Sequence, residues 1–333
     1  MRVSAKTSTS DTNKISEKET PQGWSRPSRG LWSDAFRKLL RNRLSIVGLV
    51  IVSLLLIAAI FGPLIAPYSY TEQNLLHVAK LPSREHWLGT DEIGRDLLSR
   101  LIYGARTATM VAVISTGLGV LLGLFFGVAA GYGGRWVSAG VVRLIDITMS
   151  IPGVLLAAMI SATLREPIVN WVNGIYQKTG WSFLSNTTSL DLVIVFGGLS
   201  IVFWPGYARL IRAQILSLRE KEYVEAARAV GAPAWRIALR HLLPNAIGPV
   251  IVTMTFSLAN GMVLESSLSY LGIGVRPPQA SWGNMIAANI GTWSYRPWLV
   301  AMPAAALAIT TLGINFLGDG LNDALNPRSS KSS

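Results

Sequence analysis

The residue types that perform catalysis or bind metals are sparse in this chain. It has no cysteine, so a disulfide framework, a thiol nucleophile and a thiolate metal site are excluded. Its three histidines, His77, His86 and His241, show no metal-ligand spacing, and we interpret each as a surface or interfacial residue. No lysine follows a glycine, so the Gly-Lys-Ser/Thr step of a phosphate-binding loop is missing. We predict no catalytic residue, no metal site and no cofactor in this chain.

Two further motifs point to chemistry only weakly. The block Gly89-Thr-Asp-Glu-Ile-Gly-Arg-Asp96 holds three acids but lacks the alternating oxygen ligands of a calcium loop. We predict a turn there that leads into an interfacial amphipathic helix. The triplet Asn186-Thr-Thr188 fits a glycosylation sequon, which has no meaning in a bacterial cell.

Binding chemistry is concentrated in residues 222–245, a charged segment of helix-forming residues between two long apolar stretches. Ala226 and Ala227 are small enough to let another protein surface approach closely. Gly231 can end a helix in a left-handed turn. Pro233 suits the first turn of a second helix, and Pro244 is expected to end it. The sequence therefore predicts a helix–glycine–helix docking element at one face of a membrane.

The elements that position this segment are membrane helices. Half of the residues are apolar and 14% are charged, and the apolar residues form blocks of membrane-spanning length. Polar residues with Trp171, Tyr176 and Trp181 predict an interfacial loop over 164–190. Residues 32–43 predict a short amphipathic helix on the membrane surface. The fold class is therefore all-α and polytopic, with six predicted spans at 44–65, 107–131, 137–163, 192–211, 246–264 and 298–317.

The distribution of charge predicts which ends face the cytoplasm. Of the 30 lysines and arginines, 21 fall on one side of this topology and nine on the other. The positive-inside rule then places both termini and segment 222–245 in the cytoplasm. Anionic lipid explains the formal charge of +12 better than nucleic acid does.

Glycines in the second span predict close helix packing. Gly119, Gly123, Gly127 and Gly131 recur every four residues and so lie on one face of the helix. Such a stripe lets two helix backbones approach closely. The alternative is that these glycines reflect only the general enrichment of glycine in membrane helices.

If the chain moves a solute against a gradient, the energy source is predicted to lie outside the chain. The second, fifth and sixth predicted spans contain no ionisable residue, and the fourth contains Tyr207 and Arg209 near its cytoplasmic end, whereas ion-coupled carriers usually need buried carboxylates at membrane depth. Arg143 and Asp146 can pair locally near the cytoplasmic end of the third span, and Glu265 lies at the outer end of the fifth. We therefore favour a transporter that is driven by a separate motor protein. The rival hypotheses are an ion-coupled secondary carrier and a non-transporting membrane scaffold.

Segment 222–245 resembles the EAA loop of bacterial ABC importer permeases, which has Glu-Ala-Ala, a glycine four residues later and then Leu-Pro. Further blocks resemble the DppC/OppC-type subunits of the dipeptide, oligopeptide and nickel group: Glu85–Arg106, Glu265–Gly274, Ala280–Asn284 and Gly318–Pro327. Together they cover most of residues 35–328. By this resemblance the ATPase-docking residues are Glu222, Glu225, Ala226, Ala227, Gly231, Leu243 and Pro244.

The resemblance implies a type I ABC importer permease that moves di- or oligopeptides by alternating access. It implies a homologous B-type permease, two ATPase subunits that bind ATP and Mg²⁺, and an extracytoplasmic binding protein as partners. Nickel, glutathione and oligosaccharides are the alternative substrates. Asn322 and Asn326 stand where the family more often has Arg and Asp, and the loop at 164–190 is longer than expected.

The predicted organisation has four parts. They are a disordered cytoplasmic tail over 1–30, an amphipathic segment, first span and extracytoplasmic segment over 31–106, a five-span permease core over 107–320, and a cytoplasmic C-terminal tail over 321–333.

Overall fold

The computed structural model describes residues 37–180 and 187–325, and within them the protein is helical with no strand. The tail at 1–30, residues 32–36 of the predicted amphipathic helix, Asn186 and residues 326–333 lie outside the described residues. The α-helices are α2 (Arg43–Ile65), α3 (Leu97–Tyr132), α4 (Arg135–Met149), α5 (Gly153–Thr179), α6 (Thr187–Leu218), α7 (Glu222–Ala229), α8 (Ala234–Ile237), α9 (Leu243–Tyr270), α10 (Trp282–Asn289) and α11 (Trp298–Leu325). Short 3-10 turns occur at Leu75–His77 (η1) and Ile290–Thr292 (η4), and Ala238–Leu242 (η3) is a π-helical turn.

Five helical segments in the described residues are long and apolar enough to cross a membrane, and α4 with α5 gives a sixth if the bent pair counts as one span. The segment Ala234–Tyr270, which joins α8, η3 and α9, is one of the five. Their continuous apolar composition, rather than a one-sided hydrophobic stripe, is what a helix surrounded by lipid and other helices requires. The prediction of a polytopic all-α protein is confirmed.

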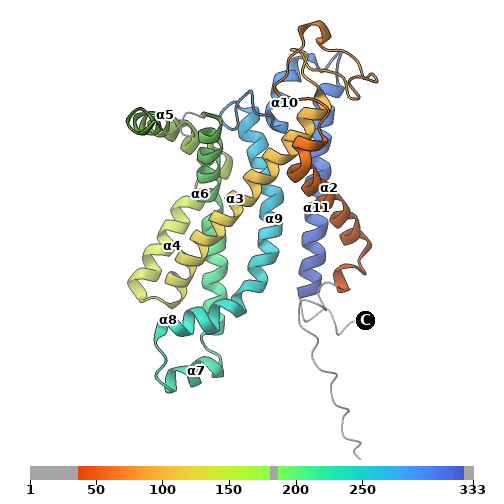
Figure 1. Cartoon of the computed structure of the whole chain (residues 1–333). Coiled ribbons are helices and arrows are strands. Elements are labelled where there is room, and N and C mark those ends of the chain that lie inside the picture. Colours follow the sequence, from red (N-terminus) through yellow and green to blue (C-terminus); the bar gives the residue numbers. More distant parts are fainter. Residues whose placement is uncertain (1–36, 181–186, 326–333) are drawn as a thin grey trace, which may run out of the picture.

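The helices form a bundle with α9 at its centre (Figure 1). Helix α9 packs against α3, α6, α10 and α11, while α2 packs against α11 and α3. One apolar core joins α3, α5, α6 and α9 to the α7–α8 region, and a second joins α2, α3, α9, α10 and α11. Helices α7 and α8 lie at one end of the bundle, and the connection between α2 and α3 lies with α10 at the opposite end (Figure 1).

The third predicted span, 137–163, is bent within its length, and the prediction of a loop over 164–190 is wrong as far as Thr179. Helix α4 ends at Met149, α5 begins at Gly153, and the two are bent by 91° at the break between them. Pro152 occupies the N-cap of α5 with extended backbone, which the missing N–H and fixed φ of proline favour. Helix α5 then continues through the predicted loop to Thr179, where Gly180 adopts a left-handed conformation (φ 69°) and ends it.

The second span is also longer than predicted. Helix α3 begins at Leu97, so the amphipathic helix expected after Asp96 is the first part of the span itself. The Asp96 carboxylate caps it by accepting hydrogen bonds from the N–H and the hydroxyl of Ser99, each at 2.8 Å. This longer α3 includes Arg100, which is buried at 2% exposure.

The predicted local pair of Arg143 and Asp146 does not form. Asp146 instead accepts from Arg209 of α6 at 3.0 Å, because the bend after α4 lays this helix against α6. Both side chains are more than half exposed, so the pair contributes little to stability.

Candidate functional site

The first helix of segment 222–245 is an eight-residue helix closed by a glycine turn. Glu222 and Glu225 lie in the first turn of α7, where negative charge is favourable beside unpaired backbone N–H groups. At the other end Gly231 has φ 76°. Its N–H donates to the Arg228 carbonyl at 2.9 Å, and the Ala232 N–H donates to the Ala227 carbonyl at 3.1 Å. This is a Schellman ending, whose left-handed residue is usually glycine.

Several buried apolar side chains fix the segment to the bundle. Val224 of α7 is fully buried in the core that contains Ile215 of α6, Ile237 of α8 and Leu242 of the π turn. Ala227 is half-buried and packs against the same core. Ala226 is exposed and remains available for contact. Val224 therefore joins α7 to the apolar core that α6 and α9 share.

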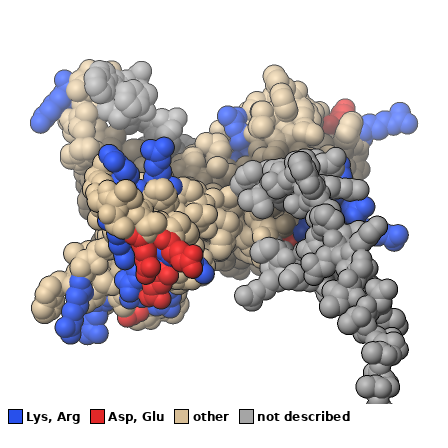
Figure 2. Space-filling model, turned by 90° about the horizontal axis from the view of Figure 1, so that it is seen from below, with Lys and Arg blue, Asp and Glu red and all other residues tan. Residues whose placement is uncertain are grey.

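The outward face of the segment combines charge with large apolar side chains. Val230 and Trp235 are 86% and 63% exposed, and Leu239 is 54% exposed. A shallow cavity of about 540 Å³ is lined by Trp235, Arg236, Leu239, Arg240 and Pro244. Viewed from this end, the molecule shows an acidic patch with basic side chains around it (Figure 2), and Glu222 and Glu225 are exposed here. Exposed apolar groups rimmed by charges are typical of a protein-binding surface.

The second helix runs directly into a membrane helix, so the prediction that Pro244 ends it is wrong. The Leu243 N–H donates to the Ala238 carbonyl, a π-type bond that widens the turn over Ala238–Leu242. Pro244 then stands at the beginning of α9, where its missing N–H needs no partner. Residues 234–270 consequently form one continuous helical path from the exposed face to the far end of the bundle.

The glycine stripe lies where α3 packs against α6. A Cβ added at Gly119 would come within 2.8 Å of the Phe203 Cβ, and one at Gly123 within 2.3 Å of the Tyr207 Cβ. Added Cβ atoms at Gly127 and Gly131 would each lie 2.8 Å from an isoleucine side chain of α6. The structure therefore brings all four glycines together in one helix–helix contact.

At the opposite end of α9, a buried carboxylate joins three hydroxyl groups. Glu265 is fully buried and accepts hydrogen bonds from Ser269 and Ser281 at 2.7 Å and from Ser266 at 3.3 Å. Sequence reasoning placed Glu265 at the end of a span but missed Ser281, which lies 16 residues away. An added Cβ at Gly283 would lie 2.0 Å from the Ser266 carbonyl oxygen, so α10 approaches α9 at backbone distance here. The two sequence blocks that carried the resemblance, Glu265–Gly274 and Ala280–Asn284, therefore meet in the contact between α9 and α10.

The helical bundle and the exposed α7–α8 segment at one of its ends define a polytopic membrane transport subunit. The family of binding-protein-dependent transport system inner membrane components matches residues 92–331, and the N-terminal membrane domain of oligopeptide transport permease C matches residues 30–82. The chain belongs to this family of ABC transporter permeases.

Individual relatives match almost end to end. The oligopeptide transport system permease protein OppC of Bacillus subtilis is 35% identical over 91% of this chain and 92% of its own length. The dipeptide transport system permease protein DppC of Alkalihalophilus pseudofirmus is 35% identical over 89% of this chain and 90% of its own length. A chain from inward-facing structures of the MetNI methionine ABC transporter shares the fold, with a TM-score of 0.52 and 20% identity over 69% of this chain and 98% of that chain.

Proposed function

We propose that the chain is a peptide-translocating permease subunit of an ATP-driven importer in the inner membrane of a bacterium. The peptide substrate is supported by the similarity to oligopeptide and dipeptide permeases over about nine tenths of each chain. The observation that carries the mechanism is the continuous helical path of residues 234–270, which starts in an exposed binding face and ends at the buried Glu265 contact.

In this mechanism an ATPase subunit docks on the α7–α8 surface. Glu225 and Ala226 provide an exposed polar contact and a close approach, while Val230 and Trp235 provide apolar area. Because Val224 is buried among α6, α8 and the π turn, movement of the docked ATPase is transmitted to α6 and α9. Displacement of these helices would open the bundle alternately to either side of the membrane.

The proposed assembly has four further subunits. A homologous B-type permease encloses the pore with this chain, two ATPases bind ATP and Mg²⁺, and an extracytoplasmic binding protein delivers the peptide. Both termini and the α7–α8 surface face the cytoplasm, as the 21 basic residues on that side predict. Membrane lipid surrounds the bundle, and no nucleic acid takes part.

The test is affinity purification of the chain from its native membrane in mild detergent, followed by mass spectrometry. We expect the wild type to retain two ATPases and a second permease, and Glu225→Arg to lose the ATPases while keeping the second permease. Glu92→Arg, an exposed acid in the α2–α3 connection, is the matched charge reversal and should retain all subunits. Recovery of the wild-type chain without any ATPase would contradict the proposal.

A further inference from the structure

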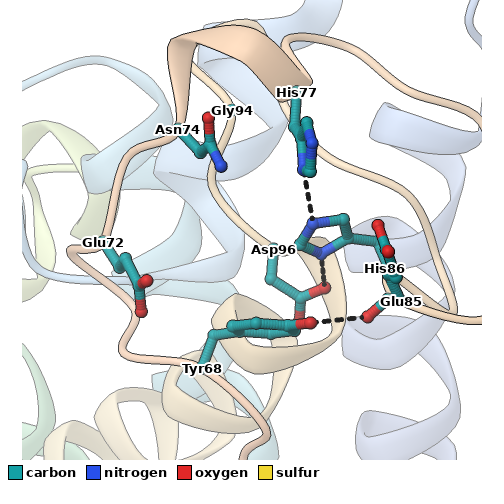
Figure 3. Close-up of a pocket in the computed structure, with 8 residues that line it drawn as sticks. All are labelled: Tyr68, Glu72, Asn74, His77, Glu85, His86, Gly94 and Asp96. Carbon is teal, nitrogen blue, oxygen red and sulfur yellow. Dashed lines mark hydrogen bonds and ion pairs between the residues drawn. The ribbon is translucent and has the colours of Figure 1, made fainter.

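The connection between α2 and α3 encloses a cavity that the transport mechanism does not use. It has a volume of about 270 Å³ and is lined by Tyr68, Glu72, Asn74, His77, Glu85, His86, Gly94 and Asp96 (Figure 3). Two of the chain's three histidines meet here, although nine positions separate them in the sequence. His86 is buried at 7% exposure, so its interpretation as a surface residue is wrong, whereas His77 is half-buried.

The two imidazole rings face one another through a nitrogen of each. His77 Nδ1 lies 3.4 Å from His86 Nε2, and the rings are inclined at 81° (Figure 3). Two histidine nitrogens that bind one tetrahedral zinc ion at about 2.0–2.1 Å lie roughly 3.4 Å from each other. The distance between His77 Nδ1 and His86 Nε2 is therefore compatible with one metal ion bound by both nitrogens, as well as with a hydrogen bond between them.

Asp96 fixes which nitrogen of His86 carries the lone pair. The Asp96 Oδ1 lies 2.9 Å from His86 Nδ1, and Oδ2 already accepts from the N–H and hydroxyl of Ser99. Because the carboxylate accepts on both oxygens, His86 Nδ1 is the donor of this pair. In the neutral ring His86 Nε2 then carries the lone pair, and it faces His77. A carboxylate behind a histidine in this way is the usual support of a metal-binding imidazole.

Packing holds the His86 ring in place but leaves room at His77. The Tyr68 ring packs on His86 with 4.8 Å between centroids, and its hydroxyl donates to the Glu85 carbonyl at 2.9 Å. His86 is 7% exposed, whereas His77 is half-buried and borders the open volume of the cavity. Glu72 and Glu85 line the same cavity and add negative charge.

We propose that this cavity binds one Zn²⁺-like divalent transition-metal ion through His77 Nδ1 and His86 Nε2. No group of three or more His, Cys, Asp or Glu side chains in the described residues is arranged as metal ligands, so the ion retains water at its other positions. Imidazole is a ligand that zinc, copper and nickel share. The bound ion fastens η1, which carries His77, to the turn that carries His86, and so stiffens the connection between α2 and α3.

The experiment titrates the purified full chain with Zn²⁺ by calorimetry in detergent, using an affinity tag without histidine. We expect one ion per wild-type chain, and binding lost in His86→Ala and in His77→Gln, which keeps a hydrogen-bonding side chain at the half-buried position. His241→Ala, which removes the remaining histidine at the other end of the bundle, should bind as the wild type does. Asp96→Asn should weaken binding about 10–100-fold.

A second measurement separates ligand loss from misfolding. X-ray absorption at the zinc edge should detect two imidazole ligands in the wild type and one in His77→Gln at high metal concentration, with the helical content of both unchanged by circular dichroism. No binding by the folded wild type at millimolar Zn²⁺, or equal binding by His77→Gln and wild type, would overturn the proposal and leave the pair as a structural hydrogen bond.

Discussion

At the scale of single residues, the backbone angle of Gly231 is expected to affect how ATP hydrolysis is coupled to uptake. Its φ of 76° is a conformation that other residues adopt at a cost, and an added Cβ there meets no atom within 4 Å. Any effect of substitution on the isolated chain therefore arises from the backbone angle and not from a clash.

We predict that Gly231→Val reduces ATP-driven uptake severalfold, whereas Gly231→Asn retains most of it. Asparagine tolerates the left-handed conformation and valine does not, with a penalty of about 1–2 kcal/mol or more for the latter. Uptake assays in cells, normalised to the amount of permease in the membrane, measure the difference. Normal uptake by Gly231→Val at normal abundance would show that the turn does not transmit movement.

Glu265 gives a second prediction at this scale. Its Oε1 accepts from both Ser269 and Ser281, and a glutamine carbonyl oxygen can do the same. We expect Glu265→Gln to retain uptake within about twofold and Glu265→Leu to be destabilised by roughly 1–3 kcal/mol, because two buried hydroxyls lose their acceptor. Thermal unfolding of both variants, with uptake, makes the comparison. Complete loss of uptake in a folded Glu265→Gln protein would indicate that the negative charge itself is required, as in an ion-coupled carrier.

At the scale of the elements, the close contact of α3 with α6 depends on glycines of α3, which have no side chain to hold the two helices apart. The closest approach is at Gly123, where a Cβ would lie 2.3 Å from the Tyr207 Cβ and 3.1 Å from the Ala208 nitrogen. Neither atom is the end of a flexible side chain, so the helices themselves must separate to admit a methyl group.

We predict that Gly123→Ala lowers the stability of the folded protein by about 1–3 kcal/mol, the usual range for overpacking. Gly117→Ala is the matched control, because it lies on the same helix and its Cβ would meet nothing within 4 Å. The measurement is thermal unfolding of the two purified variants in the same detergent. Equal stability of the two would indicate that the stripe reflects glycine enrichment alone.

Local signals in the sequence predicted part of this architecture. The left-handed turn at Gly231 and the glycine face of α3 follow from residue type and spacing, since both are properties of one short segment. The 91° bend between α4 and α5 was missed because apolar residues continue across it and only Pro152 marks the break. The pairing of His77 with His86 depends on the folded path of the connection between α2 and α3, which hydropathy does not report.

The π turn over Ala238–Leu242 was missed for a related reason. Proline near the end of a helical pattern usually marks an ending, and Pro244 satisfied that rule. The chain avoids the break by widening one turn, after which Pro244 needs no hydrogen bond. Because of this turn, the second helix of segment 222–245 is the beginning of a membrane helix and not a separate docking helix.

At the scale of the whole molecule, transport requires the α7–α8 surface and the connection between α2 and α3 to face opposite sides of the membrane. Figure 1 places them at opposite ends of the bundle. Each end has an exposed apolar side chain suited to labelling: Val230 at 86% and Leu76 at 87% exposure. Because the natural chain has no cysteine, a single introduced thiol reports without background.

We predict that a membrane-impermeant maleimide labels Leu76→Cys in cells whose outer surface is accessible, and labels Val230→Cys only after the inner membrane is opened. The reason is the charge distribution, with seven basic residues between Arg209 and Arg240 on the α7–α8 side. Thr179→Cys, at the end of α5, should label with Leu76→Cys, since Figure 1 places α5 towards that end of the bundle. Labelling of Val230→Cys in intact cells would reverse the topology, and the ATPases could then no longer reach the surface proposed to bind them.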